Sequence, residues 1–128
     1  MVKLFAFLSR REGMDVRDFV DYYENKHVPF ICSLAPVPAV YKRSYLKRGD
    51  ALNMEDAAIG FDVVTETVFP DRAALQAWLG KIFEPGTRER VVADEEKFLD
   101  RSRYWAYVVE ERVTSESCRC SGQPAGIR

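Results

Sequence analysis

The sequence predicts an α+β domain of the ferredoxin-like type, in which two β-α-β units share a four-stranded antiparallel sheet. Three observations lead to this fold class. Four segments are rich in β-branched and aromatic residues, two longer segments repeat apolar residues at helical spacing, and their order along the chain is β-α-β-β-α-β. With 128 residues the chain can form one domain with its own core. We assign that domain to residues 1–112 and expect residues 113–128 to form a polar, disordered tail.

A first strand is expected at residues 2–8, and a first helix is expected to begin at Asp15. VKLFAFLS is apolar in both alternation sets, and Asp15 is a suitable N-cap. One helical face is apolar and ends in the only histidine: Val16, Phe19, Val20, Tyr23 and His27. Because Pro29 has no N–H for the carbonyl of Asn25, we expect the helix to kink or end there, with PFICSLA forming a short further turn.

The second half of the sequence predicts three more strands and two helical segments. Strands are expected at residues 38–47, 58–69 and 103–112, with a polar loop at 49–56. A helix from Asp71 to Ile82 has the apolar face Ala74, Leu75, Trp78, Leu79 and Ile82. A last helical segment, Thr87 to Asp100, places Val91, Glu95 and Phe98 on one side.

Both helices of a ferredoxin-like domain lie on one face of the sheet, and the other face stays bare. In this sequence the bare face would carry Tyr, Trp, Phe and Val side chains. Exposed apolar surfaces of that size usually mark an interface. We therefore expect a homodimer in which two sheets pack face to face, a dimeric α+β barrel.

Composition excludes several kinds of partner. The net charge is −1 and no basic stripe is present, which argues against nucleic acid. No apolar run approaches the roughly 20 residues that span a bilayer, and no signal peptide is evident, so we expect a cytoplasmic protein with no membrane partner. The three cysteines include a C-x-C pair, Cys118 and Cys120, but no accompanying ligand motif, so we expect no metal site. No glycine-rich phosphate loop is present, and we expect no cofactor; heme on His27 is a minor alternative.

Three segments resemble the EthD-domain family. FVDYYENKHVPF (19–30) resembles its F-x-x-Y-(W/Y)-x-x-x-H-x-P signature, DVVTETVFPDRAAL (62–75) is similar to its third strand and following helix, and VADEEKFLDRSR (92–103) resembles its aDE-x-x-F-x-D segment. The resemblance covers about residues 2–112 and implies a dimeric α+β barrel. Family members resemble cofactor-free decarboxylases, dehydratases or cyclases of aromatic polyketides, and others accompany degradative oxygenases. Many members have Trp where this chain has Tyr23.

His27 is the first candidate catalytic residue, because imidazole titrates near neutrality and the family signature includes it. The alternative is a core histidine bonded to a carbonyl that Pro29 leaves free. Tyr23, one turn earlier, is a candidate hydrogen-bond donor to a substrate oxygen, or a packing residue. Asp94 is a candidate to orient His27 or hold a substrate hydroxyl; its alternative is an ion pair with Arg90 or Lys97.

Candidate substrate-binding residues lie on two strands. Tyr41, Arg43 and Tyr45 share one strand face and either line the pocket or belong to the dimer interface. Arg43 suits bidentate binding of a carboxylate. Trp105, on the last strand, is a further candidate, although such a residue is more often part of the core. We expect Tyr22 to point away, toward the surface or an interface.

These residues favour a cofactor-independent tailoring enzyme that acts on a small hydroxylated aromatic, of the polyketide type. Proton transfer by His27 would drive decarboxylation, dehydration or ring closure. Two alternatives remain open at this point: a cofactor-free monooxygenase of a polyphenol, and a non-catalytic module that binds aromatic intermediates.

Overall fold

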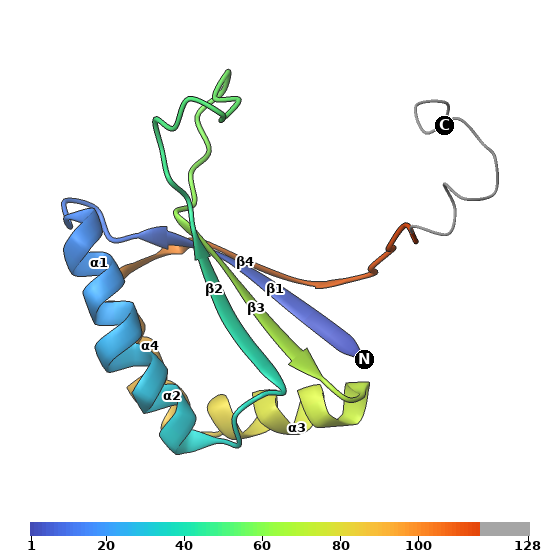
Figure 1. Ribbon diagram of the computed structural model, residues 1–128. Helices are drawn as coiled ribbons and strands as arrows, with labels where there is room; N and C mark the ends of the chain where they lie inside the picture. Colours follow the sequence, from blue (N-terminus) through green and yellow to red (C-terminus); the bar gives the residue numbers. More distant parts are fainter. Residues whose placement is uncertain (116–128) are drawn as a thin grey trace.

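A computed structural model describes residues 1–115 and shows one four-stranded sheet with helices over one face (Figure 1). The strands are β1 (Val2–Arg10), β2 (Val40–Tyr45), β3 (Val63–Phe69) and β4 (Leu99–Val109). Neighbouring strands are antiparallel and the order across the sheet is β2-β3-β1-β4. The predicted ferredoxin-like α+β fold is therefore confirmed.

The first helical region continues past Pro29, contrary to one of the two outcomes expected there. Helix α1 (Val16–Tyr22), a π-helical turn η1 (Tyr23–His27) and helix α2 (Val28–Leu34) follow one another without interruption. In the wide turn, the N–H of Val28 donates to the carbonyl of Tyr23 five residues earlier. Pro29 then occupies the first turn of α2, where it cannot donate to the carbonyl of Asn25 as another residue of a regular α-helix would.

Helices α3 (Arg72–Ile82) and α4 (Thr87–Glu95) cover the rest of this face (Figure 1). The Asp71 carboxylate accepts from the N–H of Ala74 at 2.8 Å, which caps α3 as expected. Gly86 precedes α4 with φ 91°, a conformation that favours glycine.

Three predicted boundaries are wrong by four or five residues. Helix α4 ends at Glu95 rather than at Asp100, because a turn closed by Phe98 N–H on the Glu95 carbonyl brings Phe98 inward. Strand β4 consequently begins at Leu99 instead of 103. Strand β3 begins at Val63 instead of 58, because the preceding residues belong to the long loop after β2.

The core divides into two clusters on the helix-covered face. One lies beneath α1 and consists of Leu8, Phe19, Tyr23, Val63, Phe98 and Leu99. The other lies among α2, α3 and α4 and consists of Ile31, Ala35, Ile82 and Val91. The sheet between them carries small side chains, Ala6 and Thr65, which are paired across β1 and β3. Small residues at that place leave room for a cavity.

The opposite face of the sheet has no helix over it (Figure 1). Trp105 and Tyr107 are 42% and 59% exposed there, and the Phe7 ring lies 6.5 Å from the Tyr107 ring.

None of the helices in residues 1–115 is long and apolar enough to cross a membrane. Of the expected tail, residues 113–115 have no regular secondary structure; Cys118 and Cys120 lie outside the described residues.

Candidate active site

A cavity of about 170 Å³ lies between the helices and the sheet. Its walls are mainly aliphatic and aromatic, and its polar lining groups come from η1, the strands, α3 and α4. These polar lining residues are Tyr23, His27, Tyr41, Thr65, Thr67, Trp78, Glu95 and Tyr104. A largely apolar hollow with a few converging polar groups is typical of a small-molecule site.

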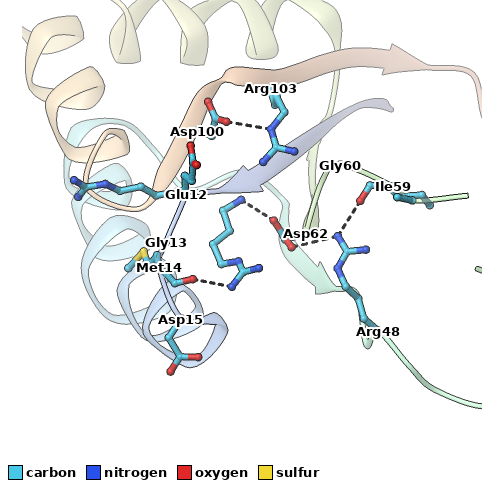
Figure 2. A pocket seen from close by; sticks show the side chains of 13 residues that line it. Glu12, Gly13, Met14, Asp15, Arg48, Ile59, Gly60, Asp62, Asp100 and Arg103 are labelled. Atoms are coloured by element: carbon cyan, nitrogen blue, oxygen red, sulfur yellow. Dashed lines mark hydrogen bonds and ion pairs between the residues drawn. The ribbon is translucent and has the colours of Figure 1, made fainter.

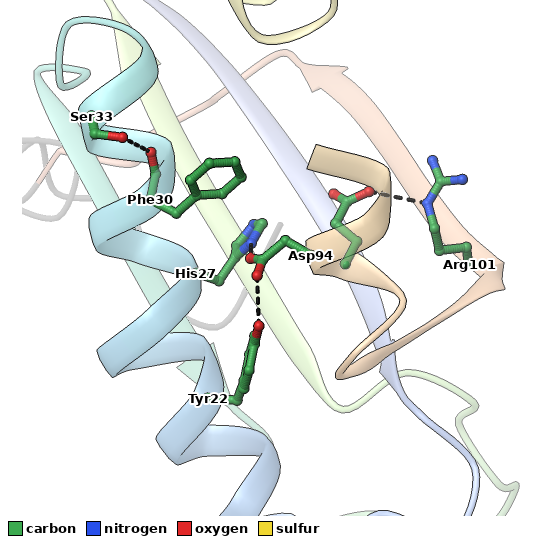
Figure 3. A network of polar contacts seen from close by, with 7 residues as sticks. Tyr22, His27, Phe30, Ser33, Asp94 and Arg101 are labelled. Carbon is green, nitrogen blue, oxygen red and sulfur yellow. Dashed lines mark hydrogen bonds and ion pairs between the residues drawn. The ribbon is translucent and has the colours of Figure 1, made fainter. Parts of the chain in front are cut away.

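His27 lies on the cavity wall and is held by Asp94 from α4 (Figure 3). The Nδ1 atom of His27 is 2.7 Å from Oδ2 of Asp94, and the Tyr22 hydroxyl donates to Oδ1 of Asp94 at 2.6 Å. The His27 ring also contacts Phe98, with ring centroids 4.9 Å apart. These contacts fix the imidazole and leave Nε2 without a hydrogen-bond partner among the described residues. Asp94 thus orients His27, which was one of its two expected roles.

Burial and the bond to Asp94 shift the pKa of His27 in opposite directions. The side chain is almost fully buried, and desolvation lowers the pKa of His27 from its ordinary 6.5, while the bond to Asp94 opposes that shift. The imidazole is therefore neutral at neutral pH. A neutral imidazole whose Nδ1 donates to a carboxylate presents Nε2 as a base.

Tyr23 is fully buried, and its hydroxyl bonds the hydroxyl of Thr65 on β3. Burial raises the pKa of Tyr23, so the phenol stays protonated. In a hydrogen bond between two hydroxyl groups, one group donates its proton and the other accepts, so the proton of the accepting group is not used. The second proton of this pair remains available to a ligand in the cavity.

Tyr41 on β2 and Tyr104 on β4 line the cavity from opposite edges of the sheet. Their hydroxyls have no hydrogen-bond partner within the described part of the chain. Burial raises the pKa of Tyr41 and of Tyr104, so both remain donors. Two free phenols in a cavity of this size suit a ligand that carries oxygen atoms.

Glu95 follows Asp94 on α4 and is the one acidic side chain in the described cavity lining. It is 5% exposed, and its Oε1 accepts from Nε of Arg101 at 3.0 Å; Figure 3 draws this bond. Burial raises the pKa of Glu95, and Arg101 opposes the shift. The carboxyl therefore shares the lining of this largely apolar cavity with His27.

Three expected substrate-binding residues lie outside this cavity. Arg43 forms a bidentate pair with Glu24, at 2.8 and 2.7 Å, so its guanidinium is already bound to a carboxylate of the protein itself. Tyr45 donates to the same Glu24. Trp105 lies on the opposite face of the sheet, beside Phe7 and Phe61. Of the four expected strand residues, only Tyr41 reaches the cavity.

Sequence reasoning missed three residues of the site. Tyr22 was expected at the surface, but its hydroxyl bonds Asp94. Glu95 was recognised only as part of a buried stripe; an acid on an apolar stripe is the signal that would have singled it out. Tyr104 belongs to the same strand face as Ala106, and no local pattern distinguishes it from a core residue.

A larger, open hollow lies at the other end of the sheet, around the turn after β1 (Figure 2). Four arginines and four acids line it, and most of these charges are satisfied within the protein. Arg48 bonds the Ile59 carbonyl and Asp62, Arg103 pairs with Asp100, and Arg10 bonds the Met14 carbonyl. This balanced, solvated surface offers no proton-transfer group comparable to His27.

No metal centre is formed by residues 1–115, where no three His, Cys, Asp or Glu side chains are grouped to hold an ion.

Comparison with known proteins identifies the domain. An EthD domain matches residues 11–102, and no curated protein sequence matches the chain. Among solved structures, an EthD family protein from Bacillus halodurans is 21% identical, with a TM-score of 0.60 over 88% of this chain and 99% of that one. A hydroxynitrile lyase from Passiflora edulis is 17% identical, with a TM-score of 0.57 over 88% and 96% of the two chains.

A dimeric ferredoxin-like protein of unknown function from Bacteroides fragilis is 7% identical, with a TM-score of 0.53 over 86% of this chain and 95% of that one. Identities this low establish a shared fold and nothing further. The matched domain spans most of the chain and contains His27, Asp94 and the sheet on which the cavity is built. The chain belongs to the EthD domain family.

Proposed function

We propose that this protein is a cofactor-independent enzyme that transfers protons on a small hydroxylated aromatic compound of the polyketide type. The observation that carries the proposal is the His27–Asp94 pair, which places an imidazole base on the wall of an otherwise apolar cavity. Dehydration and ring closure need such a base, decarboxylation needs a proton donor for the carbon that loses CO2, and none of the three needs a redox group. The hydroxynitrile lyase from Passiflora edulis, a structural neighbour, supports an enzymatic role for this fold.

The hydroxyl groups of the cavity support an oxygen-bearing ligand. The free phenols of Tyr41 and Tyr104 and the remaining proton of the Tyr23–Thr65 pair would donate to substrate oxygens. Apolar walls, such as those from Ile31 and Leu79, would hold the ring. Trp105, Arg43 and Tyr45 have no part in this proposal.

We also infer that the working unit is a homodimer formed through the bare sheet face. Trp105 and Tyr107 are large aromatic residues of β4 on this face, and both are more than one-third exposed. The ferredoxin-like relative from Bacteroides fragilis is dimeric, which supports the same arrangement here. The cavity is on the helix-covered face, so each protomer would carry a complete site.

The test is turnover of three phenol-bearing probes: a β-keto acid, a β-hydroxy ketone and an open-chain diketone. We expect one of them to react without added cofactor, and His27→Ala to lower kcat by at least about 10²-fold. His27→Gln keeps more of the side-chain volume and controls for a packing defect. Unchanged turnover in both variants would contradict the proposal.

Two further measurements separate the alternatives. Stoichiometric oxygen uptake during turnover would indicate a monooxygenase. Tight binding of the probes, measured by calorimetry, without any product would indicate a binding module. Either result would overturn the proposed proton-transfer function.

A further inference from the structure

Glu95 has the features of a reactive carboxyl rather than a structural one. A buried carboxylate in a structural role normally has both oxygens hydrogen-bonded. In Glu95, Oε1 accepts from Arg101, while Oε2 has no partner among the described residues. The side chain is nevertheless 5% exposed and lines the cavity together with His27.

The groups that face Glu95 come from three elements. Arg101 and Tyr104 lie on β4, His27 and Tyr23 on η1, and Asp94 is its neighbour on α4. One cation and one other carboxylate are therefore nearby, and desolvation is the largest influence on the Glu95 carboxyl. Burial favours the protonated acid in Glu95 and the neutral base in His27, which are the forms that a general acid and a general base need.

We propose that Glu95 is a second catalytic residue of this cavity, a general acid that protonates the oxygen leaving the substrate while His27 removes a proton from the adjacent carbon. This inference rests on the proposed function of His27. It selects dehydration from the reactions considered, because only elimination of water needs an acid at the leaving oxygen and a base at a neighbouring carbon in one step.

The step balances without a further reactant. Nε2 of His27 takes the proton of a C–H bond next to a carbonyl, and the electron pair of that bond forms a C=C bond. The neighbouring C–O bond breaks, its electron pair stays with oxygen, and the Glu95 proton converts the leaving hydroxyl to water. A proton then passes from imidazolium to the Glu95 carboxylate through solvent, which restores both residues.

The lining residues and the volume of the cavity also limit the charge and the size of the substrate. No Lys or Arg lines the described cavity, so a substrate carboxylate would have no counter-charge among the lining residues. A cavity of about 150 Å³ holds benzene, and this one has about 170 Å³. The geometry points to an uncharged β-hydroxy ketone built on a single hydroxylated ring.

The test uses the aldol adduct of meta-hydroxybenzaldehyde and acetone as a probe, with elimination followed by ultraviolet absorbance of the conjugated product. Glu95→Gln should lower the rate of water loss by about 10²-fold or more. The O-acetyl ester of the same adduct releases acetate, which needs no proton, so Glu95→Gln should eliminate acetate at close to the wild-type rate. Glu96→Gln changes the exposed neighbour and should leave both rates unchanged.

The outcomes distinguish the two proposals. Equal loss of both reactions in Glu95→Gln, or loss of neither, would overturn the role of Glu95 as acid. Normal rates in His27→Gln would overturn the proposed function itself. An infrared pH titration needs no substrate: the carboxylic acid C=O band that persists to the highest pH in the wild type should disappear in Glu95→Gln and persist in Glu96→Gln. A wild type without this band, or a band that persists in Glu95→Gln, contradicts the proposal.

Discussion

His27 Nδ1 and Asp94 Oδ2 lie 2.7 Å apart and connect η1 with α4 across 67 residues of sequence. The contact places the proton of neutral imidazole on Nδ1 when Asp94 is ionised, and Nε2 is then free to act as a base. The Tyr22 hydroxyl bonds the other oxygen of Asp94 and holds the carboxylate in this orientation. Chemistry at His27 should therefore depend on Asp94 more than on Tyr22.

We expect Asp94→Asn to lower kcat by about 10²-fold while KM changes little. An amide in this place donates to Nδ1, which moves the imidazole proton to Nε2 and removes the base. Nitrogen NMR of the single histidine checks the tautomer directly. Tyr22→Phe is the control, since it keeps the His27–Asp94 bond and should cost only a few-fold. Equal losses in the two variants would contradict an orienting role for Asp94.

Acid should destabilise the fold partly through His27. Desolvation lowers the pKa of His27 below 6.5 in the folded protein, whereas the unfolded chain titrates near 6.5. Below pH 6.5 the unfolded state therefore binds more protons than the folded state, and stability is lost as the pH falls toward the lowered pKa. We expect the thermal midpoint of His27→Gln, measured by calorimetry, to fall less steeply over that range. An unchanged slope would show that His27 is not desolvated.

Much of the fold could be predicted from the sequence, because the alternation of apolar residues in strands and their helical spacing in helices reflect directly which side chains are buried. The element order led to the ferredoxin-like sheet, and the stripe of α4 correctly placed Val91, Glu95 and Phe98 inside. The predicted helix end at Asp100 and the predicted strand start at residue 58 are wrong. A turn that contains a buried residue has the same local pattern of apolar residues as the helix or strand beside it.

The site was less predictable because its contacts join distant segments. A helical wheel assumes 100° per residue, and the π-helical turn at Tyr23–His27 departs from that spacing. Arg43 lies on the expected face of β2, yet its partner is Glu24, 19 residues away on η1, and no strand pattern reveals that pairing. Tyr22 reaches Asp94 only because α4 lies beside η1.

The pairing of Arg43 with Glu24 predicts a structural role for Arg43. Arg43→Met should lower the free energy of unfolding by about 2 kcal/mol, because the part-buried Glu24 loses both of its charge-assisted bonds to the guanidinium. Binding of resorcinol to the cavity should be unchanged, since Arg43 does not line it. Chemical denaturation and calorimetry measure the two quantities. A large loss of resorcinol affinity at unchanged stability would indicate that Arg43 takes part in ligand binding.

The size of the cavity can be reduced from its exposed edge. Ala106 lines the cavity and is itself exposed on β4, so Ala106→Leu should fill space without overpacking the core. We expect resorcinol affinity to fall at least about tenfold while the thermal midpoint stays within a few degrees of wild type. Ala77→Leu adds the same atoms on the exposed side of α3 and should bind normally. Normal binding to Ala106→Leu would place the ligand elsewhere.

The bare sheet face should control assembly. Tyr107 is 59% exposed and its ring lies 6.5 Å from that of Phe7, on the surface that would meet a second copy. In a two-fold interface, Tyr107→Glu introduces two carboxylates into the same apolar region without a counter-charge. We expect the dimer dissociation constant to rise by at least about 10²-fold, as measured by light scattering after gel filtration across a dilution series.

Leu52→Glu is the matched control for that experiment. Leu52 is 92% exposed on the long loop between β2 and β3, so the same substitution changes the net charge equally without touching the sheet face. Its dissociation constant should equal that of the wild type. Since the His27 cavity lies on the helix-covered face, the Tyr107→Glu monomer should still bind resorcinol. A variant that stays dimeric would show that the chain associates through another surface, and a monomer that fails to bind would show that the sheet interface supports the cavity.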